Sequence, residues 1–459
     1  MLAVVPAFFA PLQSLLSFLP QIAIALAAAA TAIFRPQVYR WAWHQAQAHR
    51  LATALVAVAA IGGSTAAVAW GRYRNPPPPP PTEEQKREGW WTFRGNEART
   101  GGDGSAVPGP VTSIWKYREW SVDRKPFASS PAVWAGRVYV GCDNSVLYCF
   151  DAEKGGEYPL WVFAARYSVF SSPSIANGKV YFGEGLHHNT DARVYCADAV
   201  TGRKIWDFKT SSHVEDAPTI ADGRCWFGAG DDGLWCLDAE TGAPIWQAKG
   251  MHLDCSPLLV NGLLVVGAGY GETGVAAFDA KVGTRKWFTK LPASCWGPPA
   301  LGPRGAIVGI GNGNFRDIIP DAKAEILCLS LDGGGIAWRL PLKGAVLAAA
   351  LVSGGRVYLG DQSGAFSCVD ANTGKLIWEQ TCGYSVHSSA AVAGDCVVYG
   401  CVGGHVHARR ASDGVETWTY DAQNDGFNYD CSISSSPAVV NGRVYIGCDN
   451  FFFYCLGKK

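Results

Sequence analysis

The 459-residue sequence predicts an all-β fold, an eight-bladed β-propeller of four-stranded antiparallel blades, preceded by one or two N-terminal transmembrane helices. The first observation is a motif ending in Trp that recurs about every 40 residues, the length of one blade. The second is the composition of 54 Gly, 18 Trp and 17% charged residues, which suits many short strands joined by tight turns. The third is a pair of apolar stretches before the first repeat.

These apolar stretches are residues 1–34 and 51–70, and a basic loop, residues 35–50, separates them. The second stretch has 20 residues without charge, enough for a helix to cross a bilayer. The loop contains Arg35, Arg40 and Arg50 and no acid, which predicts that it stays cytoplasmic. We therefore expect a bacterial inner-membrane anchor, with everything after Trp70 on the periplasmic side. Whether the first stretch also spans the membrane stays open.

Residues 71–89 form the predicted linker, and residues 90–459 the propeller. The linker contains six consecutive prolines, from Pro76 to Pro81, which favour a stiff polyproline stalk. Beyond residue 89 the chain has 32 Lys or Arg and 36 Asp or Glu. Because a phosphate-binding surface is basic, this balance argues against a nucleic-acid partner.

The repeat is clearest at Asp198–Trp206, Asp238–Trp246 and Asp370–Trp378, which read Asp-Ala-x-Thr-Gly-x-x-x-Trp. In the third blade we expect strands over 217–220, 224–228 and 234–237, then a Gly turn and a fourth strand with the Trp. The chain's last segment, 436–456, supplies inner strands without a Trp strand, whereas Trp115 lies in a Trp strand without inner strands. Pairing the two closes the ring and removes two exposed sheet edges. The Trp anchors of the eight blades are Trp115, Trp161, Trp206, Trp246, Trp287, Trp338, Trp378 and Trp418.

The motif and its period resemble the pyrroloquinoline quinone (PQQ) repeat family, a quinoprotein-like fold within the wider WD40-like class of repeat architectures. The segment from Trp91 to Gly101 is also similar to the lead-in before many bacterial propellers of this type. The resemblance covers about residues 90–456 and implies one of two functions. One group is the PQQ-dependent alcohol and glucose dehydrogenases, whose alcohol dehydrogenases use a disulfide between adjacent cysteines. The other is the non-enzymatic propellers that resemble the outer-membrane-assembly lipoprotein of the Bam complex (BamB-like).

The 15 cysteines include no adjacent pair and no haem-attachment motif. Six of them share one position in the third strand of their blades, where the other two blades have Ala277 and Ala408. A position that accepts Cys or Ala indicates a small buried packing site. Disulfides within the hairpins Cys142/Cys149 and Cys448/Cys455 stay open as an alternative. The six are Cys149, Cys196, Cys236, Cys328, Cys368 and Cys455.

One position on each innermost strand faces the predicted channel and is where a ligand would bind. Blades three and four repeat His-x-acid there, as His213-Val-Glu215 and His252-Leu-Asp254. Residues i and i+2 of a strand share a face, so these four side chains are candidate ligands of a divalent transition metal. The interpretation we favour for these four residues is a solvated polar rim without a ligand, and His187-His188 is interpreted as exposed loop. The eight positions are Ala128, Phe170, Glu215, Asp254, Trp296, Leu347, His387 and Ser434.

No complete catalytic constellation is present, so no catalytic residue is assigned. The favoured hypothesis is a membrane-anchored, non-catalytic module that binds a protein or cell-envelope component without a cofactor. Its loops would include 311–325, with Asn312, Asn314, Phe315, Arg316 and Asp317, and 421–433, with Phe427 and Tyr429. The alternatives are a PQQ- and calcium-dependent dehydrogenase, which the resemblance would place on Glu215, Asp254, Trp296 and His387, and a small-ligand or metal sensor.

Overall fold

The computed structural model describes residues 78–83, 90–119, 125–312, 319, 323–425 and 431–458. Within these ranges no helix is both long and apolar enough to span a membrane. The predicted anchor, residues 1–34 and 51–70, lies outside them, as does most of the linker. Asn314 to Asp317, Phe427 and Tyr429 also lie outside, so the proposed contact loops stay predictions.

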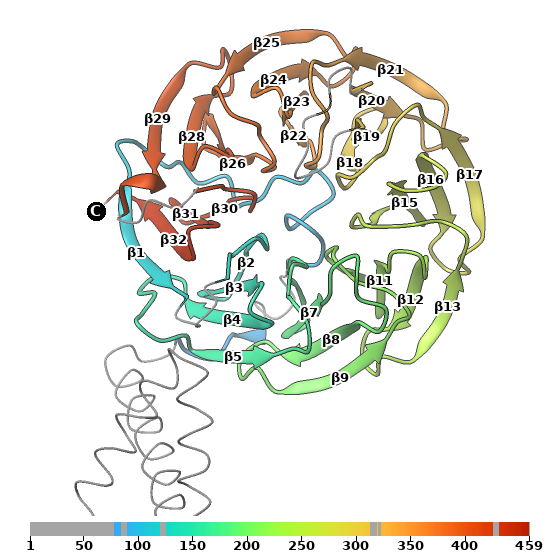
Figure 1. The fold of residues 1–459 in the computed structure, drawn as a ribbon, viewed down its shortest axis with the longest axis horizontal. Coiled ribbons are helices and arrows are strands. Elements are labelled where there is room, and N and C mark those ends of the chain that lie inside the picture. The colour runs from blue at the N-terminus through green and yellow to red at the C-terminus, as the bar shows by residue number, and fades with distance from the viewer. Residues whose placement is uncertain are drawn as a thin grey trace, which may run out of the picture. The chain divides into compact units, whose positions relative to one another are not determined.

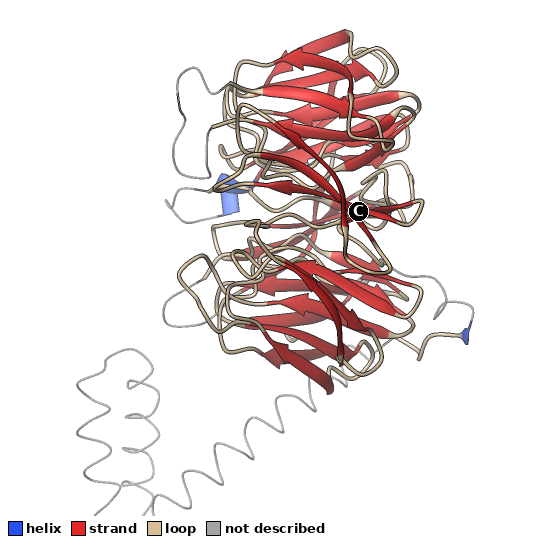
Figure 2. Cartoon of the chain, turned by 90° about the vertical axis from the view of Figure 1, so that its right-hand side faces the viewer, coloured by secondary structure: helices blue, strands red, loops and turns tan. Residues whose placement is uncertain are grey.

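The propeller prediction is confirmed, because the described strands form eight antiparallel sheets of four strands each. The first strand of each blade lies nearest the centre of the ring and the fourth at its rim (Figure 1). Seen from the side, all eight blades lie within one disc (Figure 2). In the third blade the first strand is Thr219–Ala221, which begins two residues and ends one residue later than predicted, and the second strand matches the prediction.

The first four blades contain strands β2 to β17 in chain order. They are β2 (Ala132–Trp134), β3 (Arg137–Cys142), β4 (Val146–Asp151), β5 (Trp161–Ala164); β6 (Ser174–Ala176), β7 (Lys179–Gly183), β8 (Arg193–Asp198), β9 (Lys204–Lys209); β10 (Thr219–Ala221), β11 (Arg224–Gly228), β12 (Leu234–Asp238), β13 (Pro244–Ala248); and β14 (Leu258–Val260), β15 (Leu263–Ala268), β16 (Gly274–Asp279), β17 (Arg285–Lys290).

The last four blades contain strands β18 to β32, and β1 completes the last of them. A short 3₁₀ helix, η1, follows β29. They are β18 (Ala300–Gly302), β19 (Gly305–Ile310), β20 (Glu325–Leu329), β21 (Ile336–Pro341); β22 (Leu351–Ser353), β23 (Arg356–Gly360), β24 (Ala365–Asp370), β25 (Leu376–Thr381); β26 (Ala391–Ala393), β27 (Cys396–Gly400), β28 (His405–Arg410), β29 (Glu416–Asp421), η1 (Ala422–Asp425); and β30 (Ala438–Val440), β31 (Arg443–Gly447), β32 (Phe452–Gly457), β1 (Thr112–Arg118).

The ring closes as predicted, because the N-terminal strand β1 completes the blade that the C-terminus begins. Strand β1 pairs antiparallel with β32, and Trp115 lies opposite Cys455. The final blade therefore combines strands from both ends of the propeller sequence, which leaves neither end as an unpaired sheet edge in this blade.

Each motif residue has a structural task at the contact between blades. Asp198 Oδ1 accepts hydrogen bonds from the backbone N–H and the hydroxyl of Thr201, at 2.7 and 2.8 Å, which fixes the turn. Gly202 follows with φ +71° and packs under Trp161 of the preceding blade, where a Cβ would lie 2.6 Å from the ring. Trp161 Nε1 donates to the carbonyl of Ala199 at 3.2 Å. The Trp is therefore held by the turn of the next blade.

The cysteine prediction is confirmed for the position in the third strand. In every blade that residue lies directly opposite the anchor Trp, as Cys236 does with Trp246 and Ala277 with Trp287. The six cysteines and both alanines there are fully buried. All 15 cysteines are free thiols, so the hairpins Cys142/Cys149 and Cys448/Cys455 contain no disulfide.

The lead-in segment, residues 90–104, crosses the channel and pairs with the innermost strands. Six of these strands donate one backbone N–H each to its carbonyls, and every donor lies five residues after the channel-facing position of its blade. The bonds are Ile175 to Trp90, Ile220 to Trp91, Leu301 to Glu97, Val352 to Ala98, Val392 to Thr100 and Val439 to Gly101, at 2.7–3.0 Å.

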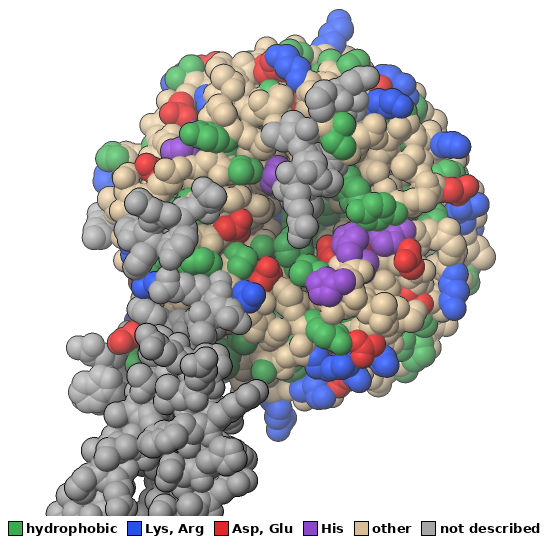
Figure 3. Space-filling view, in the orientation of Figure 1, with side chains coloured by type: hydrophobic (Ala, Val, Ile, Leu, Met, Phe, Trp, Pro, Cys, Tyr) green, Lys and Arg blue, Asp and Glu red, His purple; other side chains and the backbone are tan. Residues whose placement is uncertain are grey.

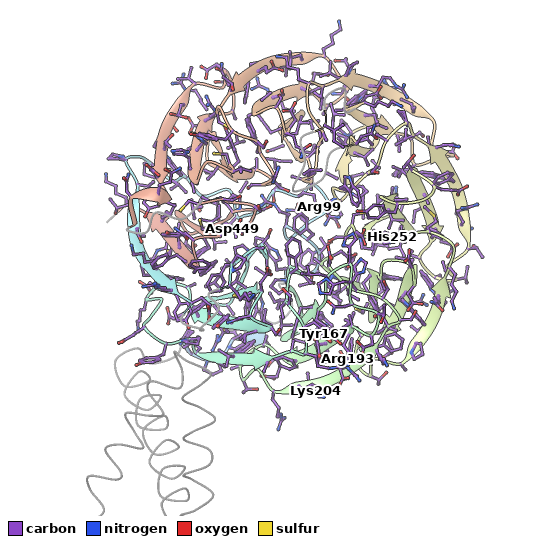
Figure 4. All side chains as sticks on the ribbon, in the orientation of Figure 1. Arg99, Tyr167, Arg193, Lys204, His252 and Asp449 are labelled. Atoms are coloured by element: carbon purple, nitrogen blue, oxygen red, sulfur yellow. The ribbon has the colours of Figure 1, made fainter. Side chains whose placement is uncertain are left out.

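Two buried arginines of the lead-in segment fasten it to the blades. Arg94 donates to the carbonyls of Pro437 and Ala390. Arg99, labelled near the centre of the ring in Figure 4, donates to the Pro299 carbonyl at 3.1 Å and to two carbonyls of the fourth blade at 3.3 Å. Burial lowers the pKa of both guanidinium groups, to about 9 for Arg94 and about 10 for Arg99. The lead-in segment is thus held across the channel by bonds to the blades, and its Phe93 lines the cavity that remains in the channel.

Candidate metal centre at the channel mouth

The channel retains a cavity of about 190 Å³ above the lead-in segment. All eight predicted channel-facing positions line it, one from each blade, and Phe93 reaches it from the lead-in segment. Figure 3 shows a group of histidines beside acidic and apolar side chains close to the centre of one face. The lead-in segment thus lines one end of the cavity. We call the other end, which carries the histidines, the channel mouth.

Three imidazoles direct the same nitrogen, Nε2, at one carboxylate. His213 Nε2 lies 2.9 Å from Asp254 Oδ1, and His252 Nε2 lies 2.7 Å from Asp254 Oδ2. His187 Nε2 lies 3.5 Å from the same Oδ2. The ligand atoms of these four residues all lie within 4.8 Å of one another. We call these residues, His187, His213, His252 and Asp254, the mouth cluster.

The opposite nitrogen of each ring, Nδ1, is held by a second contact. His187 Nδ1 lies 2.8 Å from Glu215 Oε1, and His252 Nδ1 lies 2.6 Å from Asp231 Oδ1. The third ring, His213, has its Nδ1 3.2 Å from the hydroxyl of the preceding residue, Ser212. Such outer contacts fix the orientation of metal-binding histidines in proteins, because they leave Nε2 as the free ligand atom.

Close packing positions the rings. His187 stacks on His213 with centroids 4.5 Å apart, and Tyr270 meets His252 edge-on at 5.0 Å. Gly230, with φ +45°, touches the buried face of His213, where an added Cβ would lie 2.5 Å from ring carbon Cε1. Only glycine leaves His213 this space, so the turn after β11 and the imidazole position depend on each other.

The electrostatics of the mouth cluster reflect these hydrogen bonds. Burial alone would raise the pKa of Asp254, but hydrogen bonds from His187, His213 and His252 lower it far below its usual range. The same contact with Asp254, followed by that with Glu215, raises the pKa of His187 to about 10. For His252, burial is outweighed by contacts with Asp254 and Asp231, and its pKa is raised. The carboxylate is thus surrounded by imidazole N–H groups, and a bound cation could take the place of their protons.

The structure brings together three of the four predicted metal ligands, His213, His252 and Asp254. The fourth, Glu215, contacts His187 instead and is an outer partner. Trp296 and His387 line the same cavity but stand outside the mouth cluster, and burial lowers the pKa of His387 to about 4. Metal binding by any of these residues stays a prediction.

The interpretation of His187 as an exposed loop residue is confirmed, although the sequence predicts no contact between it and the channel mouth. Its side chain is 43% exposed, yet it contacts both carboxylates of the mouth. His188 is exposed, as expected. The hairpin that follows the second strand of a blade ends at the channel mouth, so His187, Asp231 and Tyr270 all come from this hairpin in three consecutive blades. Aligning that hairpin, and not only the innermost strand, would have found them.

The described lining does not fit PQQ, the cofactor that the resemblance to quinoproteins implies. PQQ is a tricarboxylate and needs cationic partners, but the described lining residues include no Lys or Arg and do include Glu215, Asp216 and Asp254. The adjacent cysteine pair is also absent from the sequence. We therefore derive no reaction through a quinone.

Comparison with known proteins agrees with the repeat pattern. BamB from Shewanella oneidensis is 32% identical over 106 residues, 23% of this chain and 26% of that protein, so the match spans about a quarter of that relative. The crystal structure of BamB from Moraxella catarrhalis has a TM-score of 0.60 at 15% identity, over 76% of this chain and 98% of that one. Quinohemoprotein alcohol dehydrogenase from Comamonas testosteroni has a TM-score of 0.64 at 15% identity, over 82% and 81%. At that identity the two structures show a common fold.

A family model extends the agreement over more of the chain. It is described as outer membrane protein assembly factor BamB and matches residues 185–295 and 271–450. Together these matches cover more than half of the 459 residues. The chain therefore belongs to the PQQ-repeat β-propeller family described as outer membrane protein assembly factor BamB.

Proposed function

We propose that this chain is a membrane-anchored, extracytoplasmic binding module that holds a divalent transition metal ion at its channel mouth. The observation that carries the proposal is the convergence of three imidazole Nε2 atoms on Asp254, each ring being held through Nδ1. Imidazole nitrogens favour Zn²⁺, Cu²⁺, Ni²⁺ or Fe²⁺ over Ca²⁺ and Mg²⁺, which prefer oxygen ligands.

The distances suit an ion with four ligands. Zinc bonds of about 2.0–2.2 Å to nitrogen and oxygen, at a tetrahedral angle, place ligand atoms about 3.4 Å apart. The nitrogen–oxygen distances around Asp254 are 2.7, 2.9 and 3.5 Å, so small ring movements open the space. His187 is 43% exposed and gives an ion a route from solvent.

A role without catalysis fits the rest of the propeller. The described lining offers a quinone no cationic partner, and relatives named as outer membrane protein assembly factors support binding of another protein. Anchoring at the bacterial inner membrane rests on the apolar stretches 1–34 and 51–70 and the arginines between them. Protease digestion of intact spheroplasts tests this placement: cleavage of the propeller supports it, and protection until lysis contradicts it.

The metal proposal is tested by titrating the full-length chain, purified in detergent and stripped with a chelator, with Zn²⁺ and with Ca²⁺. We expect Zn²⁺ to bind, and the stoichiometry to fall by one ion per chain in Asp254→Asn and in His213→Gln. His188→Gln is the matched control, because its exposed ring lies next to His187 but outside the mouth cluster. Unchanged stoichiometry in Asp254→Asn and His213→Gln would refute the site, as would preference for Ca²⁺.

A further inference from the structure

Two cysteines and a histidine lie together in the sixth and seventh blades, away from the mouth cluster. Cys382 directly follows β25, Cys401 directly follows β27, and His407 lies within β28. Their sulfur and nitrogen atoms all lie within 4.8 Å of one another. We propose that Cys382, Cys401 and His407 bind a second metal ion, of the thiophilic class that Zn²⁺ represents.

The spacing matches a metal site. Zinc bonds of about 2.3 Å to sulfur and about 2.0–2.1 Å to nitrogen, at a tetrahedral angle, separate sulfur from nitrogen by about 3.6 Å. Cys401 Sγ lies 3.7 Å from His407 Nε2. His405 Nδ1 lies 3.9 Å from the same sulfur, so this second imidazole stands beside the remaining coordination position.

His407 is oriented as metal-binding histidines are. Its Nδ1 lies 2.8 Å from Glu416 Oε2 and 3.2 Å from the hydroxyl of Thr419. The ring stacks on Tyr399, with centroids 5.3 Å apart and planes 29° from parallel. These contacts occupy Nδ1 and direct Nε2 to Cys401, the carboxylate–histidine–metal arrangement in which the carboxylate strengthens the ligand.

Charge also favours a bound cation. Two thiolates and a neutral imidazole balance a divalent ion, and binding would release the two thiol protons. Arg409, whose side chain is 8% exposed, lies beside the site and donates to Tyr399 Oη at 2.8 Å and to the carbonyl of Thr381 at 3.2 Å. Its positive charge stabilises thiolate at Cys382.

This cluster differs from the packing cysteines of the other blades. Those lie opposite the anchor Trp, and in the seventh blade that position is Ala408, opposite Trp418. Cys382 is only half-buried, and Cys401 has both His405 and His407 as sulfur contacts. Packing alone requires neither imidazole, so a metal explains the combination better than a small buried apolar site.

The test is a Co²⁺ titration of the chelator-stripped, full-length chain under reducing conditions. Thiolate ligands give a sulfur-to-cobalt charge-transfer band in the near ultraviolet, which the nitrogen and oxygen ligands of the mouth cluster cannot give. We expect one band, saturating at one ion per chain and displaced by Zn²⁺. Cys401→Ser and His407→Gln should weaken this binding by at least tenfold.

The matched controls separate this site from other causes. Cys396→Ser changes another half-buried cysteine of the same blade and should leave the band unchanged. Asp254→Asn should also leave it unchanged, so failure of either metal site is visible separately. The inference is overturned if no band forms, if Cys401→Ser keeps it, or if Cys396→Ser removes it. A Cys382–Cys401 disulfide in the natively isolated chain would also overturn it.

Discussion

Replacing Gly230 with alanine tests whether backbone packing positions the mouth cluster. Gly230 lies in the hairpin between β11 and β12 and has φ +45°. A Cβ there would lie 2.5 Å from His213 Cε1 and 2.6 Å from Ser212 Oγ, whereas ordinary van der Waals contact begins at 3.4 Å. The imidazole must therefore move away by about 1 Å to avoid a clash with the new methyl group.

Such a movement is larger than a metal bond allows. Ligand distances vary by about 0.2 Å, so a displaced His213 is lost as a ligand, and we expect Zn²⁺ to bind about 10–100-fold more weakly. The left-handed backbone should cost about 1 kcal/mol of folding free energy, and overpacking a further 1–3 kcal/mol. Gly230→Ala is therefore expected to be about 2–4 kcal/mol less stable than the unmodified chain.

The matched control is Gly262→Ala, in the tight turn between β14 and β15. Its φ is +74° and an added Cβ meets nothing within 4 Å, so this variant carries the backbone strain alone. Zinc titration by calorimetry and urea unfolding should show normal affinity and a loss of about 1 kcal/mol. Equal zinc affinity in the two variants would refute the link between Gly230 and the imidazole.

Three further predictions concern the propeller itself. Arg99→Met removes five hydrogen bonds of a fully buried side chain, and urea unfolding should show a loss of about 3–5 kcal/mol; a loss below about 1 kcal/mol would contradict the fastening role. In Gly242→Ala the new Cβ would lie 2.7 Å from the Trp206 ring, so this variant should lose about 1–3 kcal/mol more unfolding free energy than Gly223→Ala, whose site has φ +71° and nothing within 4 Å. Equal losses in the two variants would contradict the docking of the Trp. Burial and a neighbouring carboxylate raise the pKa of Asp449 to about 6, so the folded state binds this proton more tightly than the unfolded state and loses stability as pH rises from about 4 to 6. Asp449→Asn should therefore stabilise the chain by about 2–3 kcal/mol at pH 8 and by much less at pH 4, and equal effects at both pH values would contradict the cause.

The fold was predictable because the same physical contact recurs in every blade. A Trp needs a glycine turn beneath it and a small residue opposite it, and the sequence repeats all three at blade spacing. The lead-in segment was predicted only as a resemblance. Most of its hydrogen bonds to the blades join backbone groups, and its two arginines donate to backbone carbonyls of the blades, so the side chains of the blades carry little sequence pattern that points to it.

The part of the candidate site that recurs from blade to blade was also predictable from the sequence. His213, His252 and Asp254 lie in the segments that lead into the innermost strands β10 and β14, and these segments share one register from blade to blade, so the three residues could be placed on the channel from the sequence. His187 comes from a lengthened hairpin, and only an alignment of the hairpins that follow the second strands of neighbouring blades indicates its place at the mouth. In the second site Cys382 comes from the sixth blade, whereas Cys401 and His407 come from the seventh, so their meeting depends on how these two blades pack.

The measurement that tests the central claim most directly is anomalous diffraction at the zinc edge, from crystals of the chain soaked in Zn²⁺. We predict a peak at the channel mouth, about 2.0–2.2 Å from the Nε2 atoms of the three histidines and from a carboxylate oxygen of Asp254. A crystal in which zinc is present but the mouth cluster keeps its direct histidine–carboxylate hydrogen bonds, with no peak between them, would contradict it.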